Sequence, residues 1–396
     1  MDDERITMSV EEGTAPPLSV GNSLPPQPPT PPATPQRDLF LESLKKKKLI
    51  SLVMIVKNEE KMLPGCIDSL KSIVDEFIIC DTGSTDTTKK IIEKHGRDFS
   101  MPYDGDVKTK QEALKLASLD YIIMMDADEQ IIQGVDKLRA YAEAGTDCVS
   151  CKIFDYNGRN EVTNMYNRNR LFKNNGNWAY NGPGTHGAIG GKGTILYDNF
   201  IKVSHTHVNK PAKTNKIDRI LPHLLEATKN GSKDKRAWFY LARTYKDTKK
   251  YIKAIECYET YLGLNSYEYD DEKWQAYYDI ELCNVNIGKK PFLDDMVKIN
   301  SNRPEGYNLV GIYHYNKEEY KDAISFFERA IKCTVDPKIT LFSDPREYHD
   351  IPADYLSTCY WRIGKKEKAK TLTVDLIASR PYVDKRLISN LEFYNR

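Results

Sequence analysis

The feature that most constrains the fold is a short apolar run, residues 121–125, which ends abruptly in Asp126 and Asp128. A run of this kind predicts a buried parallel strand, which would deliver both carboxylates to the carboxyl edge of a sheet. Open α/β sheets bind their ligands at that edge. Two carboxylates there suit Mg²⁺ or Mn²⁺ holding a diphosphate, because Mg²⁺ usually binds through one or two carboxylates plus substrate phosphates. The pattern therefore predicts a metal-dependent enzyme that acts on a nucleotide-linked donor.

The strand in front of the Asp-x-Asp triplet carries this prediction, and the triplet alone does not. A second copy, at Asp104 and Asp106, shows how readily the triplet recurs by chance. Without a preceding strand, either copy would be interpreted as a solvated acidic turn.

Strand-like and helix-like patterns alternate three times from residue 49 onward. Strands are predicted at residues 49–56, 76–80 and 121–125, and helices at residues 61–73, up to about residue 95, and at residues 107–118. This alternation predicts an α/β domain with a parallel sheet. Asn58, Glu59 and Asp81 follow the first two strands, so they are expected at the same edge as Asp126. The Asp81 carboxylate could accept a hydrogen bond from a base or a ribose, or it could cap the next helix.

Three motifs together resemble a known family. Residues 56–60, 81–87 and 125–129, in this order and spacing, look like family 2 glycosyltransferases with the GT-A fold. The subgroup that the chain most resembles joins this domain to tetratricopeptide helices. The resemblance implies an α/β nucleotide-diphospho-sugar transferase with a Rossmann-like, mostly parallel sheet, followed by an all-α helical repeat domain. It also implies a nucleotide-sugar donor and a divalent metal, Mn²⁺ or Mg²⁺.

The resemblance assigns roles to particular side chains. Donor contacts are expected from Asn58, Glu59, Asp81, Ser84, Lys110 and Asp126, and metal ligands from Asp126, Asp128 and His205. Asp81 would lie near the base or ribose, and Asp126 with Asp128 near the diphosphate. Lys110 stands where the subgroup usually has Arg, so a cation remains there but without the bidentate fork of Arg.

The general base is left open by the sequence. The subgroup often has His-Glu at the end of the motif that begins at Asn181, whereas this chain has His186 followed by Gly187. A hydroxyl acceptor needs a base near the anomeric carbon of the donor. The candidates are Asp155, Glu161, Glu129 and His186.

Two further motifs have plain interpretations. The glycine-rich run at residues 187–193 is not a P-loop, because no Ser or Thr follows its Lys, and we interpret it as a mobile loop over the donor site. Cys148 and Cys151 have metal-ligand spacing, but they lie in a strand-like run without a second pair, which argues against zinc. The eight cysteines are scattered, and a disulfide framework is not expected.

From about residue 216 the apolar period becomes helical and matches the 34-residue tetratricopeptide pattern. The matching residues are Trp238, Leu241, Ala242, Tyr245, Ala254 and Tyr258, then Tyr307, Val310, Gly311, Ala323, Phe327 and Ala330, then Ser357, Tyr360, Ala369, Leu376 and Pro381, with a degenerate unit around Trp274 and Ala276. Stacked helix pairs of this kind form a surface that binds peptide or protein, or they support the catalytic domain.

Composition sets the remaining limits. Nine prolines within residues 1–38 predict a disordered tail, with the transferase domain expected at residues 46–212 and the helical domain at residues 216–396. Lys and Arg total 58 against 57 Asp and Glu, so no excess positive charge favours nucleic acid. The sequence lacks both a signal-peptide pattern and an apolar stretch of about 18 residues, which predicts a cytoplasmic protein without an integral membrane segment.

The resulting hypothesis is a metal-dependent, inverting glycosyltransferase that moves a sugar from a nucleotide-sugar donor to a protein or glycan acceptor, which the helical repeats could hold. Inversion is implied by the resemblance alone. One alternative is a tetratricopeptide scaffold with an inactive transferase domain. Another is a sugar nucleotidyltransferase, which would carry a Gly-rich, Arg-containing loop where this chain has residues 57–60.

Overall fold

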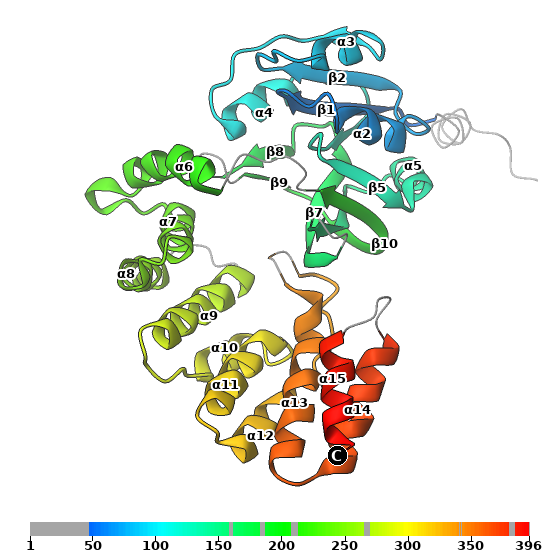
Figure 1. Cartoon of the computed structure of the whole chain (residues 1–396). Coiled ribbons are helices and arrows are strands. Elements are labelled where there is room, and N and C mark those ends of the chain that lie inside the picture. The colour runs from blue at the N-terminus through cyan, green and yellow to red at the C-terminus, as the bar shows by residue number, and fades with distance from the viewer. Residues whose placement is uncertain are drawn as a thin grey trace, which may run out of the picture. The chain divides into compact units, whose positions relative to one another are not determined.

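The structure is a computed structural model, which describes residues 47–157, 161–182, 187–206, 213–264, 270–339, 341, 343–379 and 385–395. Residues 48–396 belong to one compact unit. Within it we call residues 48–206 the sheet domain and residues 213–395 the repeat domain, and Figure 1 shows the strands in the former and helices α6–α15 in the latter. The proline-rich tail predicted for residues 1–38 lies outside the described residues.

The sheet domain contains all ten described strands and four helices. Its strands are β1 (Ile50–Val56), β2 (Glu76–Asp81), β3 (Arg97–Asp98), β4 (Tyr121–Met124), β5 (Glu129–Gln133), β6 (Cys148–Tyr156), β7 (Val162–Lys173), β8 (Trp178–Asn181), β9 (Ala188–Gly191) and β10 (Ile195–Thr206). Its helices are α2 (Leu63–Leu70), α3 (Thr88–Glu93), α4 (Asp106–Leu114) and α5 (Val135–Glu143). The three strands and three helices predicted from the alternating pattern are all present.

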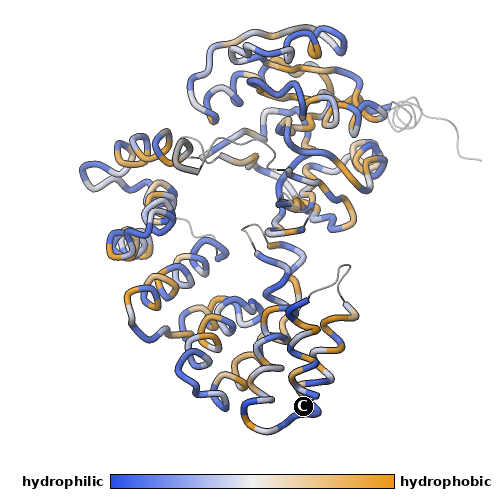
Figure 2. The backbone as a smooth tube through the Cα atoms, viewed as in Figure 1, coloured by the Kyte–Doolittle hydropathy of each residue, from blue (hydrophilic) through white to orange (hydrophobic). Residues whose placement is uncertain are grey.

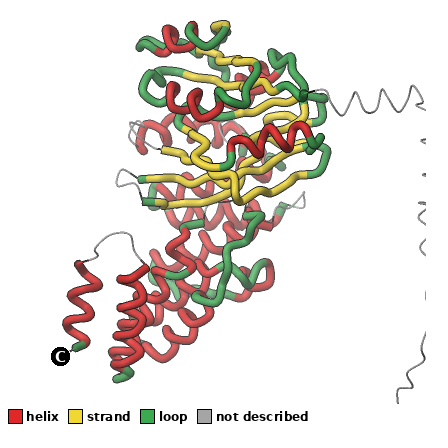
Figure 3. Tube along the Cα trace, turned by 90° about the vertical axis from the view of Figure 1, so that its right-hand side faces the viewer, coloured by secondary structure: helices red, strands yellow, loops and turns green. Residues whose placement is uncertain are grey.

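The repeat domain is helical throughout its described residues. Its helices are α6 (Lys213–Ala227), α7 (Lys235–Asp247), α8 (Tyr251–Gly263), α9 (Asp270–Asn286), α10 (Asp294–Ile299), α11 (Pro304–Asn316), α12 (Tyr320–Ala330), α13 (Asp350–Arg362), α14 (Lys366–Ser379) and α15 (Lys385–Tyr394), with short 3₁₀ turns η1 (Lys229–Gly231) and η2 (Pro345–Tyr348). Figure 3 shows this separation of strands from stacked helices. None of the described helices is long and apolar enough to cross a membrane.

Eight strands form one mixed sheet in the order β3-β2-β1-β4-β7-β6-β10-β5. The pairs β3/β2, β2/β1, β1/β4 and β6/β10 are parallel, and the other three are antiparallel. The sheet is therefore mostly parallel, as the resemblance to the GT-A fold implied. Strands β8 and β9 pair with each other in a separate antiparallel hairpin.

The central strands are buried on both faces because their apolar residues alternate between two cores. In β1, Leu52 and Met54 pack on one face with helices α2 and α5, while Val53 packs on the other face with α4. The same alternation separates Cys148 from Cys151, which lie in different cores and so cannot share a zinc ion. All eight cysteines are buried, and each is a thiol outside any disulfide.

The predicted repeats correspond to helix pairs α7/α8, α11/α12 and α13/α14, and the degenerate unit to α9. Figure 2 shows hydrophobic and hydrophilic colours alternating along these helices, which is typical of helices that bury one face. Gly311 shows why the pattern requires small residues. A Cβ atom built on it would lie 2.7 Å from the ring of Phe327 on the neighbouring helix. Pro381 of the third predicted repeat lies outside the described residues.

We expect Gly311→Ala to lower the free energy of unfolding by about 1–3 kcal/mol, because the added methyl group must displace Phe327. The control is Gly263→Ala on α8, where a Cβ atom would meet nothing within 4 Å. That substitution should leave stability unchanged or raise it slightly, since Ala is the better helix former. Urea unfolding followed by circular dichroism measures both, and equal shifts would contradict the close helix contact.

A half-buried carboxyl, that of Glu347, should make the stability of the repeat domain depend on pH. Burial raises the pKa of Glu347 to about 8, and its hydrogen bond from Asn308 offsets only part of that rise. Between the ordinary pKa of Glu and pH 8, the folded chain therefore binds a proton that the unfolded chain does not. Stability contributed by this proton is complete at low pH and is lost as pH rises toward 8.

In the wild type we expect the free energy of unfolding to fall by a few kcal/mol between about pH 5 and pH 8. Glu347→Gln should remove this fall, because Gln does not titrate. The matched control, Glu392→Gln, changes an exposed carboxyl on α15 and should leave the pH profile as it is. Urea unfolding midpoints measured across this pH range test the prediction. Parallel pH profiles for wild type and Glu347→Gln would contradict it.

Candidate active site

The register of the parallel strands places the predicted polar side chains at one edge. Val56 at the end of β1 pairs with Asp81, the last residue of β2, and Val53 pairs with Met124, the last residue of β4. Strands β1 and β2 therefore end level with each other, β4 ends three positions earlier, and Asp126 follows the end of β4 by two residues. The sequence-based expectation that these strands deliver their carboxylates to a common edge agrees with this arrangement.

The loops that follow β1 and β2 are joined by hydrogen bonds. The Asn58 side-chain oxygen accepts from the Thr85 N–H at 2.8 Å, and the Asn58 N–H donates to the Ser84 hydroxyl at 2.9 Å. The Glu59 N–H donates to the Thr88 hydroxyl at 2.8 Å. Asn58 also adopts a left-handed φ of 56°, which Asn tolerates better than most residues. The structure thus gives Asn58 and Ser84 a structural role, and their donor contacts remain predictions.

Asp81 closes the turn after β2. It is 1% exposed, and its carboxylate accepts the N–H groups of Gly83 at 3.1 Å and Ser84 at 3.1 Å. Burial acts to raise the pKa of Asp81, but these hydrogen bonds and the Lys89 ammonium 3.6 Å away lower it below its ordinary value. Asp81 therefore stays ionised, and it caps this turn and not α3, which begins at Thr88.

A buried ion pair shapes the turn that carries Asp126 and Asp128. Arg170 on β7 pairs with the Glu129 carboxylate, which also accepts the Asp126 N–H at 3.0 Å. The Arg170 guanidinium donates in addition to the Met124 carbonyl at 3.3 Å. Burial raises the pKa of Glu129, and Arg170 opposes part of that rise. Glu129 is 2% exposed and fully engaged in holding this turn, so its position disfavours the predicted role as a base.

Lys110 lies beside Asp126, and its predicted contact with the diphosphate of the donor remains a prediction. Its ammonium is 2.6 Å from Asp126 Oδ1 and 3.5 Å from the Tyr180 hydroxyl. Burial acts to lower the pKa of Lys110, but Asp126 and Tyr180 raise it above its ordinary value. The Lys110 side chain is 10% exposed, whereas that of Asp126 is 42% exposed. Asp126 is therefore the member of this pair that a ligand in solvent can reach.

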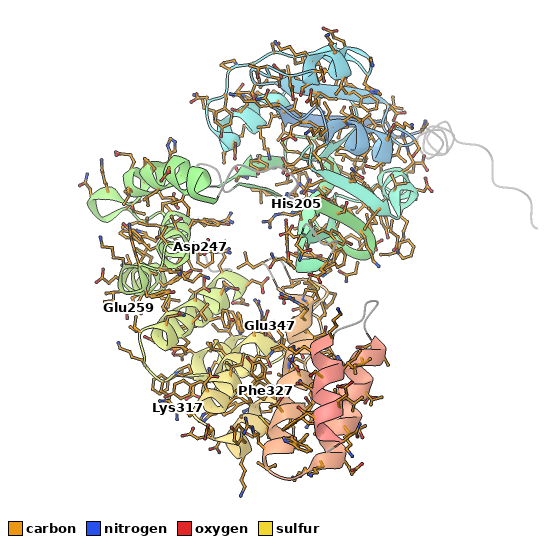
Figure 4. All side chains as sticks on the ribbon, in the orientation of Figure 1. His205, Asp247, Glu259, Lys317, Phe327 and Glu347 are labelled. Carbon is orange, nitrogen blue, oxygen red and sulfur yellow. The ribbon has the colours of Figure 1, made fainter. Side chains whose placement is uncertain are left out.

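His205, labelled in Figure 4, links two carboxylates at the other side of the Asp-x-Asp turn. Its Nδ1 is 2.8 Å from Asp155 Oδ1, and its Nε2 is 3.2 Å from Asp128 Oδ2. Tyr166 donates its hydroxyl to the same Asp155 oxygen at 3.2 Å. Burial acts to lower the pKa of His205, but the hydrogen bonds with Asp128 and Asp155 raise it to about 9. Asp155 is thus occupied in orienting His205, which disfavours its predicted role as a base.

The donor set of Asp126, Asp128 and His205 fits a divalent metal by its chemistry. Two carboxylates and an imidazole are ligands that suit Mn²⁺, and carboxylates alone suit Mg²⁺. Asp155 holds the second nitrogen of His205, as carboxylates commonly do behind metal-binding histidines. The set is not drawn together around one point, because Asp126 pairs with Lys110 and Asp128 with His205. Binding would require Asp126 to turn from Lys110.

Another group of possible ligands lies in the repeat domain. Among the described residues, His314, Glu319 and Asp322 offer ligand atoms within 4.8 Å of one another. His314 already pairs with Glu319 at 2.6 Å and stacks on Phe326, and both acidic residues are exposed. Exposed acidic groups often gather in this way without a metal, so we do not interpret this cluster as a second metal site.

The other two candidate bases are placed differently. Glu161 lies at the tip of the β6–β7 hairpin, where its carboxylate accepts the Asn157 side-chain amide at 2.8 Å. His186 lies outside the described residues. Glu161 and His186 therefore stay as predicted candidates, and no base is assigned by the described residues.

The glycine-rich run is mostly a strand, and the expected mobile loop at residues 187–193 was wrong for residues 188–191. These residues form β9, which pairs with β8. The glycines serve close packing, because a Cβ atom on Gly191 would lie 2.2 Å from the Asn177 carbonyl oxygen. A Cβ atom on Gly187 would lie 2.1 Å from the ring of Tyr180. The Tyr180 ring therefore excludes a side chain where the resembling subgroup often has Glu.

Sequence reasoning missed the roles of Tyr166 and Tyr180 and the partner of Arg170. For Arg170 a signal exists, because a charged residue within an apolar strand segment indicates a buried partner. The two tyrosines carry no comparable signal, because their partners, Asp155 on β6 and Lys110 on α4, lie on other elements of the fold.

Comparison with known proteins identifies both domains. Residues 51–202 match the family described as Glycosyl transferase family 2, and residues 235–267 match the Tetratricopeptide repeat. The chain therefore carries a family 2 glycosyltransferase domain followed by tetratricopeptide-like helices, as its motifs indicated.

Individual relatives match over part of their length. A TPR repeat-containing protein of Synechococcus elongatus is 33% identical over 135 residues, 32% of this chain and 32% of that protein. An uncharacterized glycosyltransferase of Rickettsia felis is 41% identical over 83 residues, 21% of this chain and 29% of that protein. The chain thus spans about a third of the length of these curated relatives. The solved TPR protein YrrB aligns with 47% of this chain and 87% of its own, at 18% identity and a TM-score of 0.34, and no conclusion is drawn from it.

We expect Arg170→Met to lower the free energy of unfolding by about 3–5 kcal/mol, because it leaves the buried Glu129 carboxylate without its cation. Adding Glu129→Gln should recover part of this loss, since Gln keeps an acceptor for the Asp126 N–H without the charge. The control is Arg346→Met, which removes an exposed arginine paired with Asp344 and should cost less than about 1 kcal/mol. Equal losses in Arg170→Met and Arg346→Met, measured by urea unfolding, would contradict the role of the buried pair.

Proposed function

We propose that the chain is a metal-dependent glycosyltransferase that moves a sugar from a nucleotide-diphosphate donor to a hydroxyl of a protein or glycan acceptor, with inversion. The observation that carries the proposal is the exposed Asp126 carboxylate, fixed at the carboxyl edge between Lys110 and the turn that holds Asp128. This edge is where sheets of this type bind nucleotides. The buried, ionised Asp81 at the end of the neighbouring strand supports a base or ribose contact.

Different side chains would serve different parts of the sugar transfer. Asp81 would accept hydrogen bonds from the nucleoside, and the Lys110 ammonium would face the negative charge that develops on the departing diphosphate. A divalent ion held by Asp126, Asp128 and His205 would supply Lewis-acid stabilisation of that leaving group. In a single displacement, the acceptor oxygen forms its bond to the anomeric carbon as the bond to the diphosphate breaks. The proton of the acceptor passes to a base, for which Glu161 and His186 are the remaining candidates.

The ion pair between Lys110 and Asp126 indicates how a donor could bind at this site. In the structure they neutralise each other at 2.6 Å. A diphosphate can take the place of the Asp126 carboxylate at Lys110, which would release Asp126 toward a metal. This exchange accounts for a metal site whose ligands are not yet gathered, and it makes donor and metal binding mutually dependent.

The scaffold alternative rests on Gly187, where the resembling subgroup often has Glu, and on Lys110, where it usually has Arg. Tyr180 fills the space beside Gly187, so the absence of Glu is built into the packing of the hairpin. A nucleotidyltransferase is disfavoured because residues 57–60 form a hydrogen-bonded loop without the Gly-rich, Arg-containing sequence expected there.

We expect one nucleotide sugar, together with Mn²⁺, to raise the unfolding temperature of the purified chain. A ligand at a hundred times its dissociation constant adds about 2.7 kcal/mol to the free energy of unfolding. Asp128→Asn should abolish the Mn²⁺-dependent part of this shift and the transfer of sugar, because it removes a ligand while leaving Oδ1 in place. Thermal unfolding against a panel of nucleotide sugars, with and without Mn²⁺, measures this.

The matched control is Asp104→Asn in the second Asp-x-Asp, where Asp104 is exposed and pairs with Lys108. It should bind donor and metal like the wild type. Full transfer activity in the presence of a chelator would overturn the metal assignment. Absence of a shift with every donor, from folded protein, would favour the scaffold.

A further inference from the structure

Strand β7 extends beyond the end of its neighbour β4, and the repeat domain supplies the backbone partner for the part of β7 that β4 does not reach. Strand β4 pairs with β7 only at residues 171–173. Further toward the start of β7, Met165 forms an antiparallel bridge with Ser343, which belongs to the connection between α12 and α13. We call residues 331–349 the α12–α13 connection. The Met165 N–H donates to the Ser343 carbonyl at 2.8 Å, and the Ser343 N–H donates to the Met165 carbonyl at 3.0 Å.

Asn167 makes a second attachment to the same connection. Its N–H donates to the Ile339 carbonyl at 2.9 Å, and its side-chain amide donates to the Pro337 carbonyl at 2.6 Å. Asn167 is 2% exposed, so these bonds replace water that the strand edge would otherwise need. The connection thus continues the sheet beyond the point where β4 turns away toward Asp126.

The connection is itself held firmly by the repeat domain. The Ser343 hydroxyl donates to Glu305 at 2.7 Å, and Glu305 forms a buried ion pair with Arg303 at 2.9 Å. Met165 of the sheet domain packs in one apolar cluster with Tyr307 and Tyr348 of the repeat domain. Backbone pairing, a buried ion pair and apolar contact therefore coincide at one position of β7.

The opposite face of β7 at this position belongs to the metal site. Successive residues of a strand point to opposite faces, so Met165 and Asn167 face the connection and Tyr166 faces away. Tyr166 packs in the core of the sheet domain, and its hydroxyl donates to Asp155, the carboxylate that holds His205. A three-residue segment therefore contacts the repeat domain on one face and the proposed metal-ligand histidine on the other.

We propose that the α12–α13 connection is a positioning element for the metal site, acting through β7 and Tyr166. The proposal rests on the proposed function and goes further, because it makes the repeat domain part of the transferase site. Partners that orient a metal-ligating histidine commonly change metal affinity by about 10–100-fold when they are removed. Loosening the connection frees one edge of β7, lets Tyr166 and Asp155 shift, and so weakens the hold on His205.

The experiment compares two asparagines on or next to β7. Asn167→Ala removes the side-chain bond to the Pro337 carbonyl and keeps the backbone bond to Ile339. Asn174→Ala is the matched control, because the Asn174 side-chain amide also donates to backbone carbonyls, those of Ala117 and Leu119. Ser343→Pro removes the N–H that pairs with Met165 and is the stronger variant. Binding of Mn²⁺ alone is followed through the electron paramagnetic resonance signal of free Mn²⁺, with folding checked by thermal unfolding.

We expect Asn167→Ala and Ser343→Pro to raise the dissociation constant for Mn²⁺ by about tenfold. Asn174→Ala should leave it within about twofold even where it lowers the unfolding temperature, because its bonds lie at the far end of β7 from Tyr166. On a Tyr166→Phe background the effect of Asn167→Ala should shrink, since the hydroxyl that transmits it is gone.

Equal Mn²⁺ affinity in wild type, Asn167→Ala and Ser343→Pro would overturn the positioning role while leaving the proposed function intact. An undiminished effect of Asn167→Ala on the Tyr166→Phe background would overturn the route through Tyr166. Failure of the wild type to bind Mn²⁺ would instead overturn the metal assignment of the proposed function, and the positioning role with it.

Discussion

The arrangement of the site depends on the buried ion pair between Arg170 and Glu129. Glu129 holds the N–H of Asp126, and Arg170 holds the carbonyl of Met124, so the pair closes the backbone on both sides of the turn. Two charges at 8% and 2% exposure are stable only together, because either one alone would be a buried charge without compensation. The turn that carries Asp126 and Asp128 is thus held by two buried side chains, and support of this kind keeps a site at a strand end rigid.

The sequence could predict the edge of the sheet but not the contacts beneath it. Residues 50–56, 76–81 and 121–124 form strands because their apolar runs are buried on both faces, and such runs are visible in the local sequence. The bonds that decide which carboxylate meets a ligand join residues far apart in sequence, such as Arg170 with Glu129 and His205 with Asp155. Both Glu129 and Asp155 were reasonable candidates for a base by type and position. Their partners are Arg170 and His205, and the pairing of β5, β10, β6 and β7 in one sheet brings each pair together.

The glycine-rich run illustrates a second limit. Glycine permits both mobility and close approach, and composition does not distinguish them. Here the close approach dominates, since Gly191 lies against the backbone of residues 177 and 178, where a side chain would not fit. The same steric argument links Gly187 to Tyr180, and through Tyr180 to the ammonium of Lys110. A departure from the family motif at one position is thereby tied to the charges around Lys110 and Asp126.

Strand edges explain why the two domains are joined so closely. A strand that extends past its neighbour leaves backbone N–H and carbonyl groups without partners, and buried groups of this kind cost free energy unless they are satisfied. Strand β4 must end early, because its next residues form the turn that carries Asp126 and Asp128. Strand β7 must continue, because it carries Tyr166 to Asp155. The resulting open edge lies beside the site by necessity, and in this chain a connection between two repeat helices closes it at Met165 and Asn167. The early end of β4 at the turn with Asp126 and Asp128 thus leaves open the edge to which the repeat domain is attached.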